Sequence, residues 1–218
     1  ASKTALYIRS CEKNKVKVLP PDVNKSMSSF SVEGNTIRFG LAGLKNVGLN
    51  AVKAIVEARE TGGEFKSLRD FFERADSSAL NKRMIESLIK CGAFSDFGHT
   101  RATLMMGYAE LYDSVEANKK SQLSGQINLF GMAEEDTTIK EYLEPVPEYE
   151  DSVLHAMEKE ILGIYASGHP LSKYEMQLAA CTFNTSMLAH EEDEDAEQAY
   201  DGKTVLSGLS AVFPEKTV

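Results

Sequence analysis

The sequence predicts a mainly α-helical protein with a small β element at its N-terminus. From residue 49 onward, apolar side chains recur at the spacing of one helical face. Residues 5–39 instead contain short extended runs that end at proline or glycine. Hydrophobic residues make up 42% of the 218-residue chain, which suits a buried core. No apolar run reaches the about 18 residues that a membrane-spanning helix needs, so we expect none.

The N-terminal segment is expected to form short strands. The stretch "VKVLPPDVN" reads as an extended run that ends at two prolines. The stretch "SFSVEGNTIRF" reads as a β-hairpin in which Gly34 and Asn35 form the two-residue turn.

Helices are predicted after this segment, and several of their ends carry capping signals. Ser67 and Asn81 are expected N-caps, and the Cys91–Gly92 pair is expected to end the helix that Asn81 begins. The expected helices lie at about 49–60, 67–75, 82–90, 100–116, 152–166 and 171–180. The first of them is predicted to bury a face formed by Leu49, Val52, Ile55 and Val56.

Five segments are predicted along the chain. A lone strand has no pairing partner, so "KTVLSGLSAVF" is expected to be the first strand of a further domain. The segments are a β-containing piece at 1–39, a helical hairpin domain at 40–116, a linker at 117–150, a helical connector with an acidic run at 151–200, and the single strand at 201–218.

Charge is unevenly distributed around a net value of −9. Residues 37–101 contain eleven Lys/Arg against eight Asp/Glu, whereas residues 133–160 contain ten Asp/Glu against two Lys. A slightly basic block therefore precedes an acidic one, and the net charge does not exclude nucleic-acid binding by the basic block.

A first candidate binding unit is "GLKNVGLNAVKAI", which resembles the helix-hairpin-helix motif with its Gly-hydrophobic-Gly core. Asn46 and Gly48 are expected to have positive φ, and Val47 to anchor the hairpin between the helices. The N–H groups at the start of the next helix could then hold a phosphate oxygen. Asn46 stands where the motif prefers glycine, which weakens the match. The predicted contact residues are Lys45, Asn46, Val47, Gly48, Leu49, Asn50 and Lys53.

A second unit, "NKRMIESLIKCGAFSDFGHTRATLM", repeats the layout with a less regular hairpin. Lys82 and Arg83 fall in the first turn of a helix, where positive charge opposes the helix dipole unless an anion binds nearby. Such contacts would position a duplex without reading its bases. The alternative is an ordinary glycine-containing turn between helices. The predicted contact residues are Lys82, Arg83, Gly92, Ala93, Phe94 and Gly98.

A third candidate is the segment "SGQINLFGM", where two large apolar residues stand together before an acidic, core-poor stretch. This setting predicts a short linear motif that docks in a partner's pocket. The alternative is that the apolar pair packs back on the chain's own core. The motif residues are Gln126, Ile127, Asn128, Leu129 and Phe130.

The sequence contains no P-loop, GxGxxG, HExxH or nucleophile-elbow motif, so we expect no catalytic residue, metal or cofactor in this chain. Glu158 and Glu160 are predicted to be solvated surface residues. Cys11, Cys91 and Cys181 are far apart in the sequence, which is typical of reduced thiols.

Taken together, these stretches resemble the bacterial DNA polymerase III alpha subunits of the DnaE type. The resemblance covers residues 16–174 in the family's order. It rests on "VLPPDVNKSMSSF", "IRFGLAGLKNVG", "FKSLRDFFER", "NKRMIESLIKCGAFSDFG", "QINLF" and "EKEILGIYASGHPLSKY".

This resemblance implies a role for each segment. Residues 1–39 would close the fingers domain, and residues 40–116 would form the tandem helix-hairpin-helix domain that grips duplex DNA. Residues 126–130 would be the peptide that binds the sliding clamp, the beta subunit. Residues 201–218 would be the first strand of a truncated OB domain.

The resemblance also sets expectations for the parent protein. It would carry out template-directed DNA synthesis in the bacterial cytoplasm, with Mg²⁺ held in a palm domain that nothing in this chain matches. This chain should therefore not polymerise by itself. Its expected partners are duplex DNA of any sequence, the sliding clamp and, through missing regions, other replicase subunits.

Two other classes of protein remain open at this point. A helix-hairpin-helix repair enzyme, such as a DNA glycosylase, would need a catalytic Asp or Lys beside the hairpin, whereas the residues after Gly48 are core-facing except Lys53. A protein-interaction adaptor without DNA contact would bind no phosphate at either hairpin.

Overall fold

The computed structural model describes residues 7–8, 10–11, 13–123, 143–168 and 170–180. The chain divides into a first unit, Ala1–Ser172, and a second, Lys173–Val218. Three predicted features lie outside the described residues: the motif at 126–130, the acidic run at 191–197 and the strand expected from residue 203.

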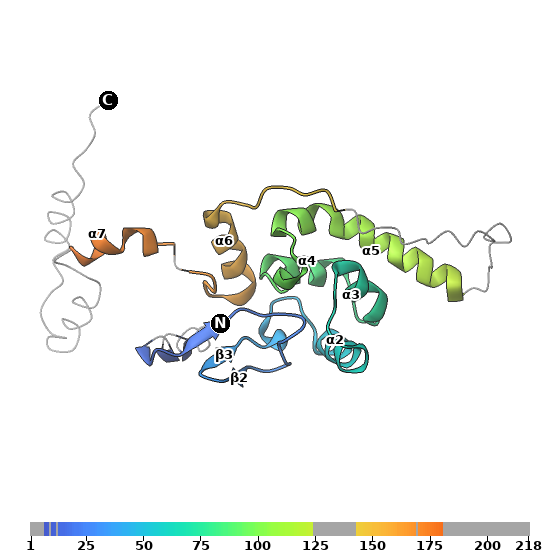
Figure 1. Ribbon diagram of the computed structural model, residues 1–218, viewed down its shortest axis with the longest axis horizontal. Coiled ribbons are helices and arrows are strands. Elements are labelled where there is room, and N and C mark those ends of the chain that lie inside the picture. The colour runs from blue at the N-terminus through green and yellow to red at the C-terminus, as the bar shows by residue number, and fades with distance from the viewer. Residues whose placement is uncertain (1–6, 9, 12, 124–142, 169, 181–218) are drawn as a thin grey trace, which may run out of the picture. The chain divides into compact units, whose positions relative to one another are not determined.

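The predicted fold class is confirmed, because helices dominate and a small sheet lies near the N-terminus (Figure 1). The elements are β1 (Lys17–Leu19), β2 (Ser31–Glu33), β3 (Thr36–Arg38), the 3-10 turn η1 (Leu41–Gly43), α2 (Leu49–Gly62), α3 (Leu68–Arg74), α4 (Lys82–Lys90), the 3-10 turn η2 (Ser95–Phe97), α5 (Arg101–Leu123), α6 (Asp151–Leu162), the 3-10 turn η3 (Ser172–Tyr174) and α7 (Glu175–Ala179). Among the described residues, no helix is both long and apolar enough to cross a bilayer.

The sheet has the strand order β1-β3-β2, with β1 parallel and β2 antiparallel to β3. Glu33 pairs with Thr36, so Gly34 and Asn35 form the predicted two-residue turn, and Gly34 has φ +58°. A positive φ is typical of the turns that match the twist of a β-hairpin. The turn prediction is therefore confirmed.

The helices of the first unit enclose an aromatic core. Phe71, Phe72 and Phe94 are fully buried, and Phe71 contacts the other two rings edge to face at centroid distances of 5.8 and 5.1 Å. Both predicted N-caps are confirmed, since Ser67 and Asn81 accept hydrogen bonds from the backbone N–H three residues on. These caps fix where α3 and α4 begin.

The prediction that Leu49 is buried is wrong. Leu49 is 64% exposed, whereas Ala51, Val52 and Ile55 are buried. With about 100° of rotation per residue, the stripe formed by those three residues points more than a quarter turn away from Leu49. The start of α2 therefore presents an apolar side chain to solvent, beside the first hairpin.

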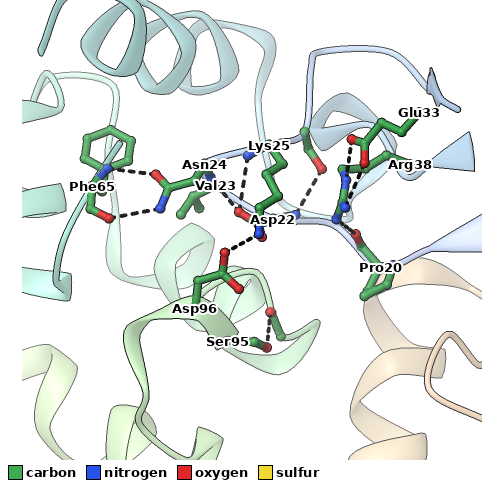
Figure 2. Close-up of polar contacts among 12 residues, drawn as sticks. Pro20, Asp22, Val23, Asn24, Lys25, Glu33, Arg38, Phe65, Ser95 and Asp96 are labelled. Atoms are coloured by element: carbon green, nitrogen blue, oxygen red, sulfur yellow. Dashed lines mark hydrogen bonds and ion pairs between the residues drawn. The ribbon is translucent and has the colours of Figure 1, made fainter. Parts of the chain in front are cut away.

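The loop at residues 20–26, which follows β1, contacts the helical part of the chain (Figure 2). The side-chain amide of Asn24 donates to the carbonyl of Phe65 (2.9 Å) and accepts from its N–H (2.8 Å). Lys25 forms ion pairs with Asp22 and with Asp96 of η2. The hydrogen bond from Lys25 lowers the pKa of Asp96. Short-range and long-range contacts thus fix this loop against both the α2–α3 turn and the second hairpin.

Arg38 anchors the sheet end of the same loop. Its guanidinium forms a bidentate pair with Glu33 (2.6 and 2.9 Å) and donates to the carbonyl of Pro20 (3.1 Å). The hydrogen bond and ion pair raise the pKa of Arg38 and lower that of Glu33. The β-hairpin is therefore fastened to the loop that follows β1.

Helix α5 extends to Leu123, beyond the predicted end near residue 116. The added stretch contains no glycine or proline, so nothing in it interrupts a helix. Lys119 also gives it a packing role, because its ammonium group donates to the carbonyls of Phe72 (2.7 Å) and Ala75 (3.2 Å) at the C-terminus of α3. A cation is favourable at that end of a helix.

Residues 143–150, here called the strap, run back along α5 before α6 begins. Leu143 is buried against α5 at Gly107, where a Cβ atom would lie 2.3 Å from a Leu143 methyl carbon. Val146 receives a hydrogen bond from the hydroxyl of Thr100 (2.8 Å) and donates its N–H to Thr103 (2.9 Å). The strap is therefore held along more than one turn of α5.

The prediction that Glu158 is a solvated surface residue is wrong. It is fully buried and pairs with the guanidinium of Arg101 at 2.8 Å. Its second carboxylate oxygen accepts from the N–H groups of Ala166 (3.0 Å) and Ser167 (2.9 Å) and from the Ser167 hydroxyl (3.0 Å). Glu160 matches the prediction better, with a side chain that is 48% exposed.

The same site explains two helix ends. Arg101 also donates to the carbonyl of Lys90, the last residue of α4 (3.0 Å). Helix α6 ends at Leu162, four residues earlier than predicted, because Gly163 adopts the left-handed conformation (φ +76°). This early end allows the chain to turn so that residues 166–167 can reach Glu158.

Cys91 follows α4 directly and is fully buried. Burial raises the pKa of its thiol to about 12.

We expect Glu158→Gln to lower the free energy of unfolding by about 3–5 kcal/mol at neutral pH, because it leaves the guanidinium of Arg101, whose side chain is only 16% exposed, without its counter-ion. The matched variant Glu160→Gln removes a more exposed pair with Lys90 and should cost about 1 kcal/mol or less. Urea denaturation followed by circular dichroism measures both. Equal effects of the two variants would contradict a structural role for the buried pair.

The same pair of variants tests the pH dependence. Burial acts to raise the pKa of Glu158, but hydrogen bonds from Arg101 and Ser167 outweigh it, so the pKa lies below its ordinary value. The stability from this depressed pKa is present above the unfolded pKa of about 4.3 and is lost as pH falls through the folded pKa. Glu158→Gln should therefore flatten the loss of stability below about pH 4 relative to Glu160→Gln.

Candidate nucleic-acid interface

The first hairpin joins η1 to α2 through residues 44–48. Asn46 has φ +65°, as predicted, and Val47 is buried in the core, as predicted. The prediction of positive φ at Gly48 is wrong, because Gly48 is extended (φ −77°, ψ 153°) and is the N-cap of α2. Only one left-handed residue is needed, since the chain enters the helix directly from an extended N-cap.

Contacts to two other helices hold this hairpin in place. The side-chain amide of Asn46 donates to the hydroxyl of Ser87 on α4 at 3.0 Å. The backbone N–H of Lys45 donates to the carbonyl of Ile161 on α6 at 3.2 Å. Asn46 thus supplies both the left-handed conformation and a bond to α4, which a glycine could not make.

The N-terminus of α2 is open. Gly48 provides no side-chain cap, and no acidic residue lies in the first turn. Leu49 and Asn50 are exposed there. The first N–H groups of a helix have no partner within the helix and favour an anion. A Cβ atom placed on Gly48 would meet no atom within 4 Å, so this position borders open space.

Cations flank this open end. Lys45 and Lys53 are exposed, and among the described residues neither forms an ion pair. Arg83 is also exposed and lies one helical turn before Ser87, the residue that contacts the hairpin. Lys82 differs, since it pairs with Asp113 of α5 at 2.7 Å. Asp113 thus offsets the positive charge of Lys82 at the start of α4, and no external anion is needed to do so.

The second hairpin is arranged differently. Gly92 and Gly98 have φ of +78° and +76°, and the side chains of Ala93 and Phe94 are buried. The N–H groups of Gly92 and Ala93 donate to carbonyls of α4, and those of Ser95, Phe97 and Gly98 donate to carbonyls within the hairpin. These amides of the second hairpin are therefore already hydrogen-bonded to the chain.

The N-terminus of α5, which follows the second hairpin, already holds a carboxylate. Glu148 of the strap accepts hydrogen bonds from the backbone N–H groups of Arg101 (2.8 Å) and Ala102 (3.1 Å). Thr103 N–H donates to the hydroxyl of Thr100 at 3.1 Å. Sequence reasoning missed Glu148, because it lies 47 residues from Arg101 in an acidic stretch with no local pattern.

The charged groups around the hairpins are mostly paired with one another. In the part of the chain that the structure describes, no three His, Cys, Asp or Glu side chains gather as metal ligands would. The basic side chain of Lys90, between the hairpins, is held by Glu86 (2.9 Å) and Glu160 (3.1 Å), and the bond to Glu86 raises its pKa.

Comparison with known proteins gives a consistent result. A family model described as a helix-hairpin-helix motif matches residues 15–104. The chain is 42% identical over 182 residues to the DNA polymerase III subunit alpha of Mycobacterium leprae, covering 82% of this chain and 15% of that protein. It is 43% identical over 184 residues to the subunit of the same name from Thermus aquaticus, covering 84% and 15%. For Campylobacter jejuni the identity is 37% over 190 residues, covering 85% and 16%.

The first hairpin yields a stability prediction. Asn46→Ala should destabilise the protein by about 1–2 kcal/mol through the left-handed conformation and by about 1 kcal/mol more through removal of the bond to Ser87. Asn46→Gly keeps the conformation accessible and should fall between the wild type and Asn46→Ala. Thermal denaturation ranks the three proteins. If Asn46→Gly were as unstable as Asn46→Ala, the backbone conformation would not be the constraint.

Proposed function

We propose that this chain is a non-catalytic part of a replicative DNA polymerase and that it holds duplex DNA by its phosphates. Its sequence belongs to the family of DNA polymerase III alpha subunits. The chain spans about 15% of the length of the relatives it matches. The parent protein would use Mg²⁺ in a separate domain to add nucleotides to a primer, and this chain would keep the duplex in place.

The observation that carries the proposal is the open N-terminus of α2. Gly48 has an extended conformation that any residue can adopt, and a side chain at this position would clash with no other part of the chain. Because neither backbone conformation nor packing requires a glycine here, the glycine fits a position where the backbone of another molecule approaches closely. The exposed N–H groups, Lys45 and Lys53 would together contact adjacent phosphate oxygens of one strand.

These contacts set the character of the binding. Backbone amides and lysines recognise phosphate and not base edges, so affinity should be independent of sequence and fall steeply with salt. The leucine exposed at the start of α2, Leu49, would lie against the sugar-phosphate backbone beside the same amides. The second hairpin's residues Gly92, Ala93, Phe94 and Gly98 would serve chiefly to support the domain, given their internal bonds and burial.

A second, finer proposal concerns the motif Gln126–Phe130, which rests on the sequence alone. Leu129 and Phe130 would enter an apolar pocket of the sliding clamp, with Gln126 at its edge. Burial of the pair yields about 3–6 kcal/mol gross, and ordering the segment opposes much of it. A roughly micromolar contact results, which becomes useful when DNA is bound at the same time.

The test of DNA binding is Gly48→Ser. A serine N-cap should leave stability unchanged or raise it by about a few tenths of a kcal/mol. Its hydroxyl would compete for the α2 amides, and its side chain would fill the approach, so DNA binding should fall. Fluorescence anisotropy with two unrelated duplexes at low and moderate salt measures this. The slope of log affinity against log salt should flatten by about 0.9 for each phosphate that the variant no longer neutralises.

A matched lysine pair controls for net charge. Lys45→Ala should weaken binding equally for both duplexes, whereas Lys17→Ala on β1 should not. Wild-type affinity in Gly48→Ser and Lys45→Ala would contradict the proposal. Absence of binding by the wild type even at low salt would favour the adaptor class.

The clamp proposal has its own test. The double variant Leu129→Ala/Phe130→Ala should abolish capture of the chain by a bacterial sliding clamp and leave the melting temperature nearly unchanged. The matched control Ile127→Ala/Asn128→Ala changes positions that the motif leaves loose and should retain capture. A fall of many degrees in the melting temperature would identify the apolar pair as core.

A further inference from the structure

The two helices that follow the hairpins begin in opposite states. No side chain caps the first N–H groups of α2, and Leu49 and Asn50 there are exposed. The equivalent groups of α5, those of Arg101 and Ala102, donate to the carboxylate of Glu148. The comparison is close because both helices lack an acidic residue in their own first turn.

The Glu148 carboxylate has the geometry of a bound anion. One oxygen accepts the N–H of Arg101 at 2.8 Å, and the other accepts the N–H of Ala102 at 3.1 Å and that of its own neighbour Tyr149 at 3.0 Å. Such charge-assisted bonds at a helix N-terminus are the ones that a phosphate would make. The acid belongs to the strap and not to α5, so it reaches the helix end from a distant part of the sequence.

The strap does not depend on this carboxylate. Leu143 against Gly107, and Val146 against Thr100 and Thr103, hold it along α5 independently. Glu148 itself is exposed. Its side chain can therefore leave the helix end, or be changed to a neutral one, while the strap stays in place.

Space for a phosphate exists beside the carboxylate. A cavity of about 360 Å³ is bordered by Gly98, His99, Thr100, Arg101 and Glu148, among others. The cavity opens at the same helix end that the carboxylate occupies. Arg101, whose backbone N–H the carboxylate accepts, also borders this cavity.

We propose that Glu148 takes the place of a DNA phosphate at the second hairpin, so that the chain grips the duplex through the first hairpin alone. This inference rests on the proposed function. Glu148 sets which of the two hairpins is available to nucleic acid, and it prevents a second phosphate contact that the tandem arrangement would otherwise provide.

The test is Glu148→Gln in the full chain, with Glu144→Gln as the matched control. Both remove one exposed negative charge from the strap, but only Glu148 contacts α5. Glu148→Gln should raise affinity for duplex DNA about tenfold at low salt, as one new charge-assisted contact would, and steepen the salt slope by about 0.9. Glu144→Gln should leave the salt slope unchanged. Equal effects of the two variants would overturn the proposal.

Two further measurements separate this inference from the proposed function. In the Gly48→Ser background, Glu148→Gln should restore binding through the second hairpin. In NMR titrations with inorganic phosphate, the amide resonances of Arg101 and Ala102 should shift in Glu148→Gln and not in the wild type. Unshifted resonances in the variant would overturn the role of Glu148 even where the wild type binds DNA. Shifted resonances without any duplex binding would overturn the proposed function and keep the anion site.

Discussion

The buried ion pair between Arg101 and Glu158 is the contact on which the arrangement of the helices depends. It joins the end of α4, the start of α5, the middle of α6 and the turn at residues 166–167. Desolvation offsets much of the attraction in such a pair, so its main effect is to make other arrangements costly. Gly92 is part of the same constraint, because a Cβ atom there would lie 2.8 Å from the guanidinium. The left-handed Gly92 thus leaves room for the guanidinium beside the second hairpin.

The two hairpins show how the same local layout can lead to different uses of the backbone. Every N–H group needs a partner, which can come from the chain, from water or from another molecule. At the second hairpin the chain supplies the partners, through its own carbonyls and the strap. At the first hairpin it supplies an anchor, Asn46 to Ser87, and leaves the helix end open. The first hairpin is therefore anchored to α4 and α6 while the end of its helix stays uncapped.

Features set by neighbouring residues could be predicted from the sequence, and those set by distant residues could not. The caps at Ser67 and Asn81 and the turn at Gly34 depend on a few adjacent positions, and the structure has all three. Glu158 reads as a surface residue because its partner Arg101 is 57 residues away. The packing of the α5 extension likewise involves distant residues, because Lys119 contacts carbonyls 44 and 47 residues away.

The candidate site follows the same rule. The left-handed conformation of Asn46 was predictable, since asparagine tolerates it better than most residues. The extended conformation of Gly48 was not, because a glycine permits both signs of φ and the pattern alone does not choose. Apolar spacing alone assigns Leu49 to the core, whereas the buried stripe of α2 is formed by Ala51, Val52 and Ile55.

The burial of Cys91 makes the second hairpin a site where opening can be timed chemically. Only a thiolate reacts readily with alkylating reagents, and a pKa of about 12 keeps this thiol protonated while the fold is closed. Its labelling must therefore wait until α4 and the hairpin separate from the core. The partly exposed Cys11 reacts without that step and provides an internal reference for the reagent. The ratio of the labelling rates of Cys91 and Cys11 therefore measures how often the structure around the ion pair opens locally.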